Sequence, residues 1–175
     1  MFEGGSKGSA PIVLIGLPAV GKSTVGAIVA RRLGLRFVDV DALIETQAGR
    51  PITEIFATDG EAGFRALELA ATVSALTDGG VIALGGGAVT NPALRQALAG
   101  HRVLWLRASE RVAVQRVGHS DIRPLLRGDV AGKWRALAAA REPLYAQVAT
   151  LVIETDGRTP GQVAQQVIAQ LEGDK

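Results

Sequence analysis

The sequence predicts an α/β protein in which helices flank both faces of a parallel β-sheet. Two observations carry this prediction. Short apolar segments alternate along the chain with longer segments that carry helix signals. The apolar segments are continuous rather than interleaved with polar residues, which indicates strands buried on both faces, as in a parallel sheet. Together these features predict βαβ units wound into a doubly wound sheet.

The composition is that of an ordinary soluble domain, with 47% hydrophobic and 21% charged residues and a net charge of +2 over 175 residues. Lysine and arginine are scattered, so no nucleic-acid footprint is expected. The chain has no cysteine, which excludes disulfides and fits the cytoplasm. The apolar run at 10–20 is too short to span a membrane. Without a heptad seam or a long apolar edge, we expect a monomer.

Five strands and a first helix follow from these patterns. The helix is expected over Lys22–Leu33 and ends at Gly34, a typical C-terminal glycine. The strands are expected at Ile12–Ile15, Arg36–Asp39, Val81–Leu84, Arg102–Leu106 and Leu151–Glu154.

Further helix starts are indicated by capping signals. Thr58–Glu61 matches a capping box and predicts a helix that runs to about Leu76. Asn91 followed by proline predicts a short helix, and Thr159 followed by proline predicts the last helix, ending near Leu171. Residues 1–10, rich in glycine and serine, are expected to form a flexible leader, and residues 11–175 a single domain.

The strongest chemical signal is the segment Gly16–Ser23, which matches the Walker A pattern G-x-x-x-x-G-K-[ST] between a buried strand and a helix. Backbone amides and the helix N-terminus can surround phosphate oxygens. Lys22 can reach the β- and γ-phosphates, and Ser23 can ligate Mg²⁺. Ala19 and Val20 are larger than residues often found in such loops. The segment predicts a nucleoside-triphosphate site rather than a glycine-rich turn with a chance lysine.

Two carboxylates, Asp39 and Asp41, follow the second strand. On an extended strand they would share one face and lie beside the Walker A loop. One can hold the metal through its water shell, and the other can accept the proton of an attacking hydroxyl. The alternative is that Asp41 is simply a helix N-cap.

A run of glycines and three arginines complete the candidate site. Gly85–Gly87 can form an amide surface that an anion approaches closely, or an ordinary turn. Arg65, Arg123 and Arg141 have the fork geometry that matches carboxylate and phosphate oxygens. Each alone could equally be a solvated surface residue, because arginine is usually exposed.

The motifs taken together resemble the shikimate kinase family. Their order and spacing match from about Pro11 to the last helix. The segment from Gly49 to Glu61 also resembles that family's substrate-binding segment. The motifs that carry the resemblance are Gly16–Ser23, Asp39–Asp41, Phe64–Arg65, Leu84–Val89, Arg123–Leu126 and Arg141–Tyr145.

This resemblance implies a three-layer P-loop fold with a five-stranded parallel sheet, as in nucleoside-monophosphate kinases. A substrate-binding segment is expected at about 40–70 and a mobile lid at about 117–130. The implied reaction transfers the γ-phosphoryl group of ATP, with Mg²⁺, to the 3-hydroxyl of shikimate. Its products are ADP and shikimate 3-phosphate, an intermediate of chorismate and aromatic amino-acid biosynthesis.

The resemblance also implies residue roles. Lys22, Asp41 as base and Arg123 on the lid would be catalytic, and Ser23 and Asp39 would serve the metal. Shikimate would be bound by Asp41, Arg65, Gly86, Gly87 and Arg141. ATP would be bound by Gly16, Ala19, Val20, Gly21, Lys22, Ser23, Thr24, Arg116, Arg123 and Arg158.

Two alternatives stay open at this point. A kinase of the same fold that acts on another polyol or sugar acid, such as gluconate, would keep the Walker A loop and alter Asp41, Arg65 and Arg141. A kinase-like domain retained as a small-molecule sensor would bind without turnover. The presence of all three residues favours the shikimate kinase interpretation.

Overall fold

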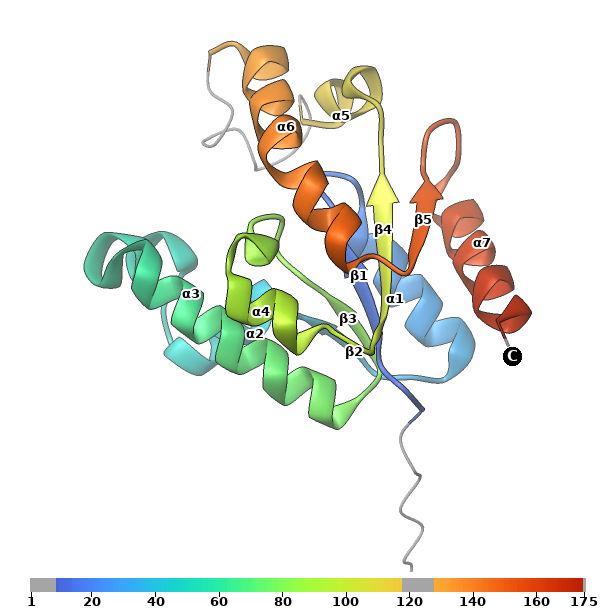
Figure 1. The fold of residues 1–175 in the computed structure, drawn as a ribbon, viewed down its shortest axis with the longest axis horizontal. Coiled ribbons are helices and arrows are strands. Elements are labelled where there is room, and N and C mark those ends of the chain that lie inside the picture. The colour runs from blue at the N-terminus through green and yellow to red at the C-terminus, as the bar shows by residue number, and fades with distance from the viewer. Residues whose placement is uncertain (1–8, 118–127, 175) are drawn as a thin grey trace, which may run out of the picture.

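The computed structural model describes residues 9–117 and 128–174 and has one five-stranded sheet in the order β2-β3-β1-β4-β5. Each of the paired neighbours runs parallel (Figure 1). The predicted α/β class and strand positions are therefore confirmed, within one residue at each end. The strands are β1 Ile12–Ile15, β2 Phe37–Asp39, β3 Val81–Ala83, β4 Arg102–Arg107 and β5 Leu151–Glu154.

Helices lie on both faces of this sheet (Figure 1). Helices α1 and α7 pack side by side on one face, while α6 and the α3–α4 pair lie on the other. Among the described residues, no helix is both long and apolar enough to cross a bilayer. The helices are α1 Lys22–Leu33, α2 Val40–Ala48, α3 Ile52–Asp78, the 3₁₀ turn η1 Ala88–Thr90, α4 Pro92–Ala97, α5 Glu110–Val117, α6 Val130–Val148 and α7 Pro160–Gly173.

The central strands form the core, as their apolar runs predict. All four residues of β1 are buried, and so are the four middle residues of β4. The edge strand β5 is different, because only Ile153 is buried while Val152 is 45% exposed. The burial of both faces follows from the two helical layers that a parallel sheet carries.

The capping predictions had mixed outcomes. Asn91 caps α4, and Thr159 forms a capping box with Gln162 at α7. The capping box predicted at Thr58 is wrong, because its hydroxyl donates to the Glu54 carbonyl inside a helix that already began at Ile52. Helix α3 is instead kinked at Gly60, whose φ of 72° and ψ of −179° are non-helical angles that glycine adopts readily.

The fold gathers three connections at one edge of the sheet. The Walker A loop follows β1, Asp39 ends β2, and Gly85–Gly87 follow β3, and these strands are neighbours in the order β2-β3-β1. In a parallel sheet the carboxyl ends of neighbouring strands meet at the same edge, where ligands of α/β proteins bind. Topology alone thus brings these three segments together.

Candidate active site

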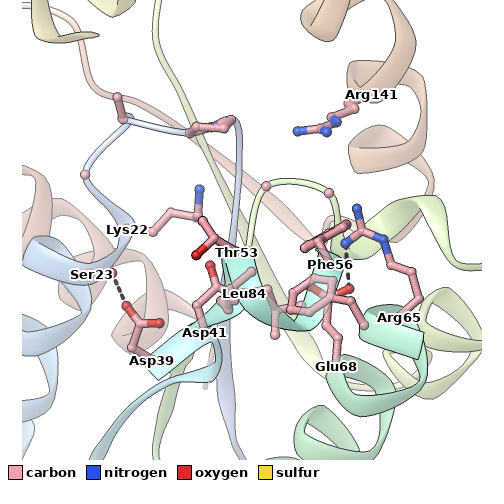
Figure 2. Close-up of a pocket in the computed structure, with 18 of the residues that line it drawn as sticks. Lys22, Ser23, Asp39, Asp41, Thr53, Phe56, Arg65, Glu68, Leu84 and Arg141 are labelled. Carbon is pink, nitrogen blue, oxygen red and sulfur yellow. Dashed lines mark hydrogen bonds and ion pairs between the residues drawn. The ribbon is translucent and has the colours of Figure 1, made fainter. Parts of the chain in front are cut away.

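A cavity of about 600 Å³ lies at this carboxyl edge. The Walker A loop and the two aspartates form one end of it, and Arg65 of α3 and Arg141 of α6 the other (Figure 2). The residues lining it are Pro18, Ala19, Gly21, Lys22, Ser23, Thr24, Asp39, Asp41, Ile52, Thr53, Phe56, Phe64, Arg65, Glu68, Leu84, Gly85, Gly86, Gly87 and Arg141. The cavity therefore joins a phosphate-binding loop to a pair of arginines.

The phosphate-binding loop opens helix α1 without a side-chain cap. Gly21 is the N-cap, in the left-handed conformation with φ of 96°, and no side chain within residues 9–117 and 128–174 caps the amides of the first turn. These amides and the positive end of the helix dipole are therefore available to an anion. Gly16 is required for a second reason, since a Cβ there would lie 2.4 Å from the Leu106 carbonyl oxygen.

Lys22 is folded back over this loop. Its Nζ donates to the carbonyl oxygens of Gly16 at 2.7 Å and Leu17 at 2.9 Å. Burial lowers the pKa of Lys22 to about 8, and the charges of Asp41 and Asp39 only partly oppose this effect. A buried cation with a lowered pKa gains strongly from a bound anion, which suits a lysine that meets phosphate.

Ser23 and Asp39 form a second pair at the same end of the cavity. The Ser23 hydroxyl donates to Asp39 Oδ2 at 2.5 Å (Figure 2), while Asp39 Oδ1 accepts from the Ala42 amide. Hydroxyl and carboxylate oxygens are the hard ligands that Mg²⁺ prefers. The described residues contain no group of three or more acidic, histidine or cysteine side chains that could hold a metal ion by themselves. This donor set fits Mg²⁺, which is commonly held by one or two protein ligands together with phosphates and water.

Asp41 reaches the cavity by a different route from the one predicted. The strand β2 ends at Asp39, which caps helix α2, and Asp41 lies in the first turn of that helix. The strand-based prediction that both carboxylates share one face is therefore wrong, because the Asp39 cap starts a helix between them. The alternative that Asp41 is itself the cap is also wrong.

The carboxylate of Asp41 lies in a largely buried environment, near charges of both signs. Burial, followed by the nearby Asp39, raises its pKa, and Lys22 and Arg65 oppose this shift. Its Oδ1 is buried and has no hydrogen-bond partner among the described residues. Unpaired buried oxygens are rare and mark strain, chemistry or a missing partner. This oxygen is therefore available to a ligand hydroxyl.

Arg65 is held at the cavity wall by Glu68, one turn further along α3. Its Nη1 donates to Glu68 Oε1 at 2.9 Å (Figure 2), and Glu68 is only 1% exposed. Burial raises the pKa of Glu68, although the Arg65 hydrogen bond and charge work against that. Arg65 Nε and Glu68 Oε2 have no partner in the described part of the chain, so donor and acceptor capacity remains for a ligand.

The loop Gly85–Gly87 is an exceptionally close fit. A Cβ on Gly85 would lie 2.9 Å from Asp41 Oδ1, one on Gly86 2.7 Å from Pro18 Cδ, and one on Gly87 2.5 Å from Arg65 Nη2. The segment does turn, since the Ala88 amide donates to the Gly85 carbonyl oxygen at 3.1 Å. A side chain at Gly86 would also clash with the Pro18 ring, whereas side chains at Gly85 and Gly87 would displace the ends of Asp41 and Arg65 from the cavity wall.

Four of the predicted residues that the structure describes do not line the cavity: Gly16, Val20, Arg116 and Arg158. Arg116 of α5 donates to the Val20 carbonyl at 3.1 Å, behind the phosphate-binding loop. Arg158 bonds the Glu154 carbonyl at 2.7 Å and also contacts Gln166. Arg123 and most of the predicted lid lie outside the described residues.

The cavity also contains residues that the sequence did not single out. Glu68 is the most important of them. Its position three residues after Arg65 on the same helix was the available sign that the two side chains form an ion pair. Pro18, at a variable position of the Walker A segment, and Thr53, within the segment from Gly49 to Glu61, also line the cavity although neither was named individually. Phe56 lies against Phe64, with ring centroids 4.6 Å apart, and forms the apolar wall.

Comparison with known proteins places this chain in a family. The protein-family model described as "Shikimate kinase" matches residues 18–172 of the sequence. A shikimate kinase from Mycobacterium avium strain 104 is 52% identical over 161 residues, covering 91% of this chain and 92% of that protein.

Solved structures agree. A shikimate kinase from Acinetobacter baumannii in complex with shikimate superposes with a TM-score of 0.86 at 35% identity, covering 95% of this chain and 94% of that one. A gluconokinase from Sinorhizobium meliloti 1021 superposes with a TM-score of 0.60 at 20% identity over 96% of this chain and 97% of that one, a likeness of fold alone.

Proposed function

The chain belongs to the shikimate kinase family, and from this premise we propose how its residues carry out the reaction. It is an ATP-dependent shikimate kinase. We propose that it transfers the γ-phosphoryl group of ATP to the 3-hydroxyl of shikimate, releasing ADP and shikimate 3-phosphate. One observation carries the proposal: a single cavity places Lys22 and Asp41 opposite Arg65 and Arg141.

At the nucleotide end, the first turn of α1 and the loop before it bind the phosphates of ATP. Gly16, Ala19–Gly21 and Thr24 supply backbone amides, and Lys22 moves from its two carbonyl acceptors to the phosphate oxygens. Arg116 and Arg158 border the nucleotide. Ser23 and Asp39 would hold Mg²⁺. When bound, the ion neutralises charge on the phosphates.

At the acceptor end, the carboxylate of shikimate lies between Arg65 and Arg141, with the Gly86 and Gly87 backbone beside it. Both guanidinium groups border the cavity, and Arg65 keeps an unpaired Nε for a ligand oxygen. Charge-assisted bonds of this kind are the strongest available to a carboxylate. The acceptor hydroxyls then lie toward Asp41, whose Oδ1 has no partner among the described residues.

The chemical step follows from this placement. Asp41 accepts the proton of the 3-hydroxyl while that oxygen forms a bond to the γ-phosphorus. The bond between this phosphorus and the β–γ bridging oxygen breaks, and ADP leaves with the electron pair. Lys22, and Arg123 by the family resemblance, meet the charge on the transferring oxygens. The raised pKa of Asp41 makes this carboxylate a stronger base than an ordinary aspartate.

The acceptor atom can be tested with a shikimate analogue that lacks the 3-hydroxyl. The analogue keeps the carboxylate, so it should inhibit competitively with shikimate while receiving no phosphoryl group. If ³¹P NMR shows that this analogue is phosphorylated, the assignment of the 3-hydroxyl as acceptor is overturned.

We further propose that the protein is a monomer and acts in the cytoplasm, as the sequence suggests. Light scattering of the purified protein measures its mass and so tests the monomer.

A further inference from the structure

Tyr145 is the only tyrosine of the chain and is fully buried on α6. Its hydroxyl donates to the Gly86 carbonyl oxygen at 2.5 Å, across 59 positions of sequence. Its ring packs on Trp105 of β4, with ring centroids 5.6 Å apart. The tyrosine therefore ties helix α6 and the sheet to the glycine loop, although it does not line the cavity itself.

This hydrogen bond sets the orientation of one peptide unit. The described residues contain no cis peptide bond, so the Gly86–Gly87 peptide is trans. In a trans peptide the C=O and N–H groups point in opposite directions. With the Gly86 oxygen held by Tyr145, the Gly87 N–H is directed away from Tyr145. Within residues 9–117 and 128–174, no acceptor is recorded for this N–H, and Gly87 borders the cavity beside Arg65.

Tyr145 also stands one helical turn after Arg141, the other candidate for binding the carboxylate. Burial raises the pKa of the Tyr145 hydroxyl well above its ordinary value, and the charge and hydrogen bond of Arg141 only partly oppose this. The hydroxyl therefore keeps its proton and remains a donor throughout the working pH range. The hydroxyl thus bonds Gly86 on one side and lies near the Arg141 guanidinium on the other.

We propose that Tyr145 is a positioning residue for substrate binding, which aims the Gly87 amide at the carboxylate of shikimate and keeps it in register with Arg141. The proposal rests on the proposed role of this loop in binding the carboxylate. It assigns to the hydroxyl a task that is separate from the packing of the ring. A buried backbone amide with no acceptor would otherwise be costly, and a ligand oxygen supplies what it lacks.

The test is Tyr145→Phe, which keeps the ring on Trp105 and removes only the hydroxyl. Thr90→Val is the matched control, because Thr90 Oγ1 makes a similar bond, 2.6 Å long, to the Gly87 carbonyl of the same loop. That carbonyl shares its peptide with the Ala88 N–H, which already bonds Gly85 at 3.1 Å. Loss of the threonine hydroxyl thus loosens the loop without freeing an amide that faces the ligand.

We expect Tyr145→Phe to raise KM for shikimate about tenfold, the effect of about one lost hydrogen bond, with KM for ATP unchanged. Thr90→Val should leave both KM values unchanged, whatever it does to the melting temperature. With a shikimate analogue whose carboxylate is replaced by hydroxymethyl, the effect of Tyr145→Phe should shrink to less than twofold.

Two outcomes would overturn the proposal. One is an unchanged KM for shikimate in folded Tyr145→Phe, and the other is an equal rise in Thr90→Val. If Tyr145→Phe does not fold, NMR of the Gly87 amide in the wild-type enzyme decides the matter. Shikimate should shift this amide signal and the hydroxymethyl analogue should not, and equal shifts with the two ligands would contradict the proposal. Failure of the wild-type enzyme to phosphorylate shikimate would instead contradict the proposed function.

Discussion

The buried carboxylate of Glu68 holds the guanidinium of Arg65 at the cavity wall, with Oε1 2.9 Å from Nη1. A second carboxylate, Glu61, approaches the same guanidinium at 3.6 Å but is 71% exposed. Exposed ion pairs of this kind contribute little, whereas removing one partner of a buried pair has large effects. The orientation of Arg65 therefore depends on Glu68.

Glu68→Gln should weaken shikimate binding. The amide keeps the shape of the side chain but loses the charge that anchors Arg65, so we expect KM for shikimate to rise about tenfold, with kcat less affected. Steady-state kinetics at saturating ATP measure this. Glu61→Gln is the matched control and should be silent. Equal effects of the two substitutions would show that Glu68 has no special role.

Asp41→Asn should remove the base while leaving the cavity intact. We expect kcat to fall by about 10² to 10³, the usual contribution of a general base. The raised pKa of Asp41 places the acid limb of the wild-type rate above the ordinary value of 3.8, because the rate falls as this carboxyl is protonated. The residual rate of Asp41→Asn should not fall in this acid range of the pH profile. Asp78→Asn, at the far end of α3, is the control, and an acid limb that persists in Asp41→Asn would exclude Asp41 as its source.

Lys22→Met should abolish activity and also change the pH dependence of stability. The pKa of Lys22 is lowered from 10.5 to about 8, so the folded protein binds fewer protons than the unfolded chain between these values. The free energy of unfolding of the wild type therefore rises with pH across this window. Relative to Lys22→Met, it should rise by about 2 kcal/mol between pH 7.5 and 9.5. Urea unfolding of both proteins, without ligands, gives this difference, and a constant difference would contradict the buried state of the lysine.

Ala19→Gly should stabilise the protein. Ala19 has a φ of 66° and is the one non-glycine residue with positive φ in the described part of the chain. The left-handed conformation costs alanine about 1–2 kcal/mol, and the extra freedom of glycine when unfolded offsets part of this, leaving a gain of about 0.5–1 kcal/mol. Ala136→Gly, on the exposed face of α6, should instead lose about 1 kcal/mol. Chemical denaturation distinguishes the two, and a loss at both positions would contradict strain at Ala19.

Local patterns predicted much of this molecule. The apolar runs located the strands, and Gly16–Ser23 identified the phosphate-binding loop, because both signals lie in consecutive residues. Asp41 was expected in the cavity for the wrong reason, since the Asp39 cap turns the chain into a helix one residue before it. Thr58 was misread because a capping box in the sequence does not reveal a helix that has already begun.

The supporting residues could not be predicted in the same way. The bond between Tyr145 and Gly86 joins positions 59 apart, and nothing in either segment specifies the other. The narrow fit of Gly85–Gly87 is likewise visible only when Pro18, Asp41 and Arg65 are placed over them. Such contacts arise from the packing of helices on the sheet, which sequence patterns do not encode locally.

The most direct test of the account is ADP release from MgATP by the purified protein, measured with shikimate, with gluconate and with neither. We predict rapid release with shikimate, accompanied by one equivalent of shikimate 3-phosphate, and only background release in the other two reactions. Release that requires gluconate, or shikimate binding without any release, would contradict the central claim that this cavity transfers a phosphoryl group to shikimate.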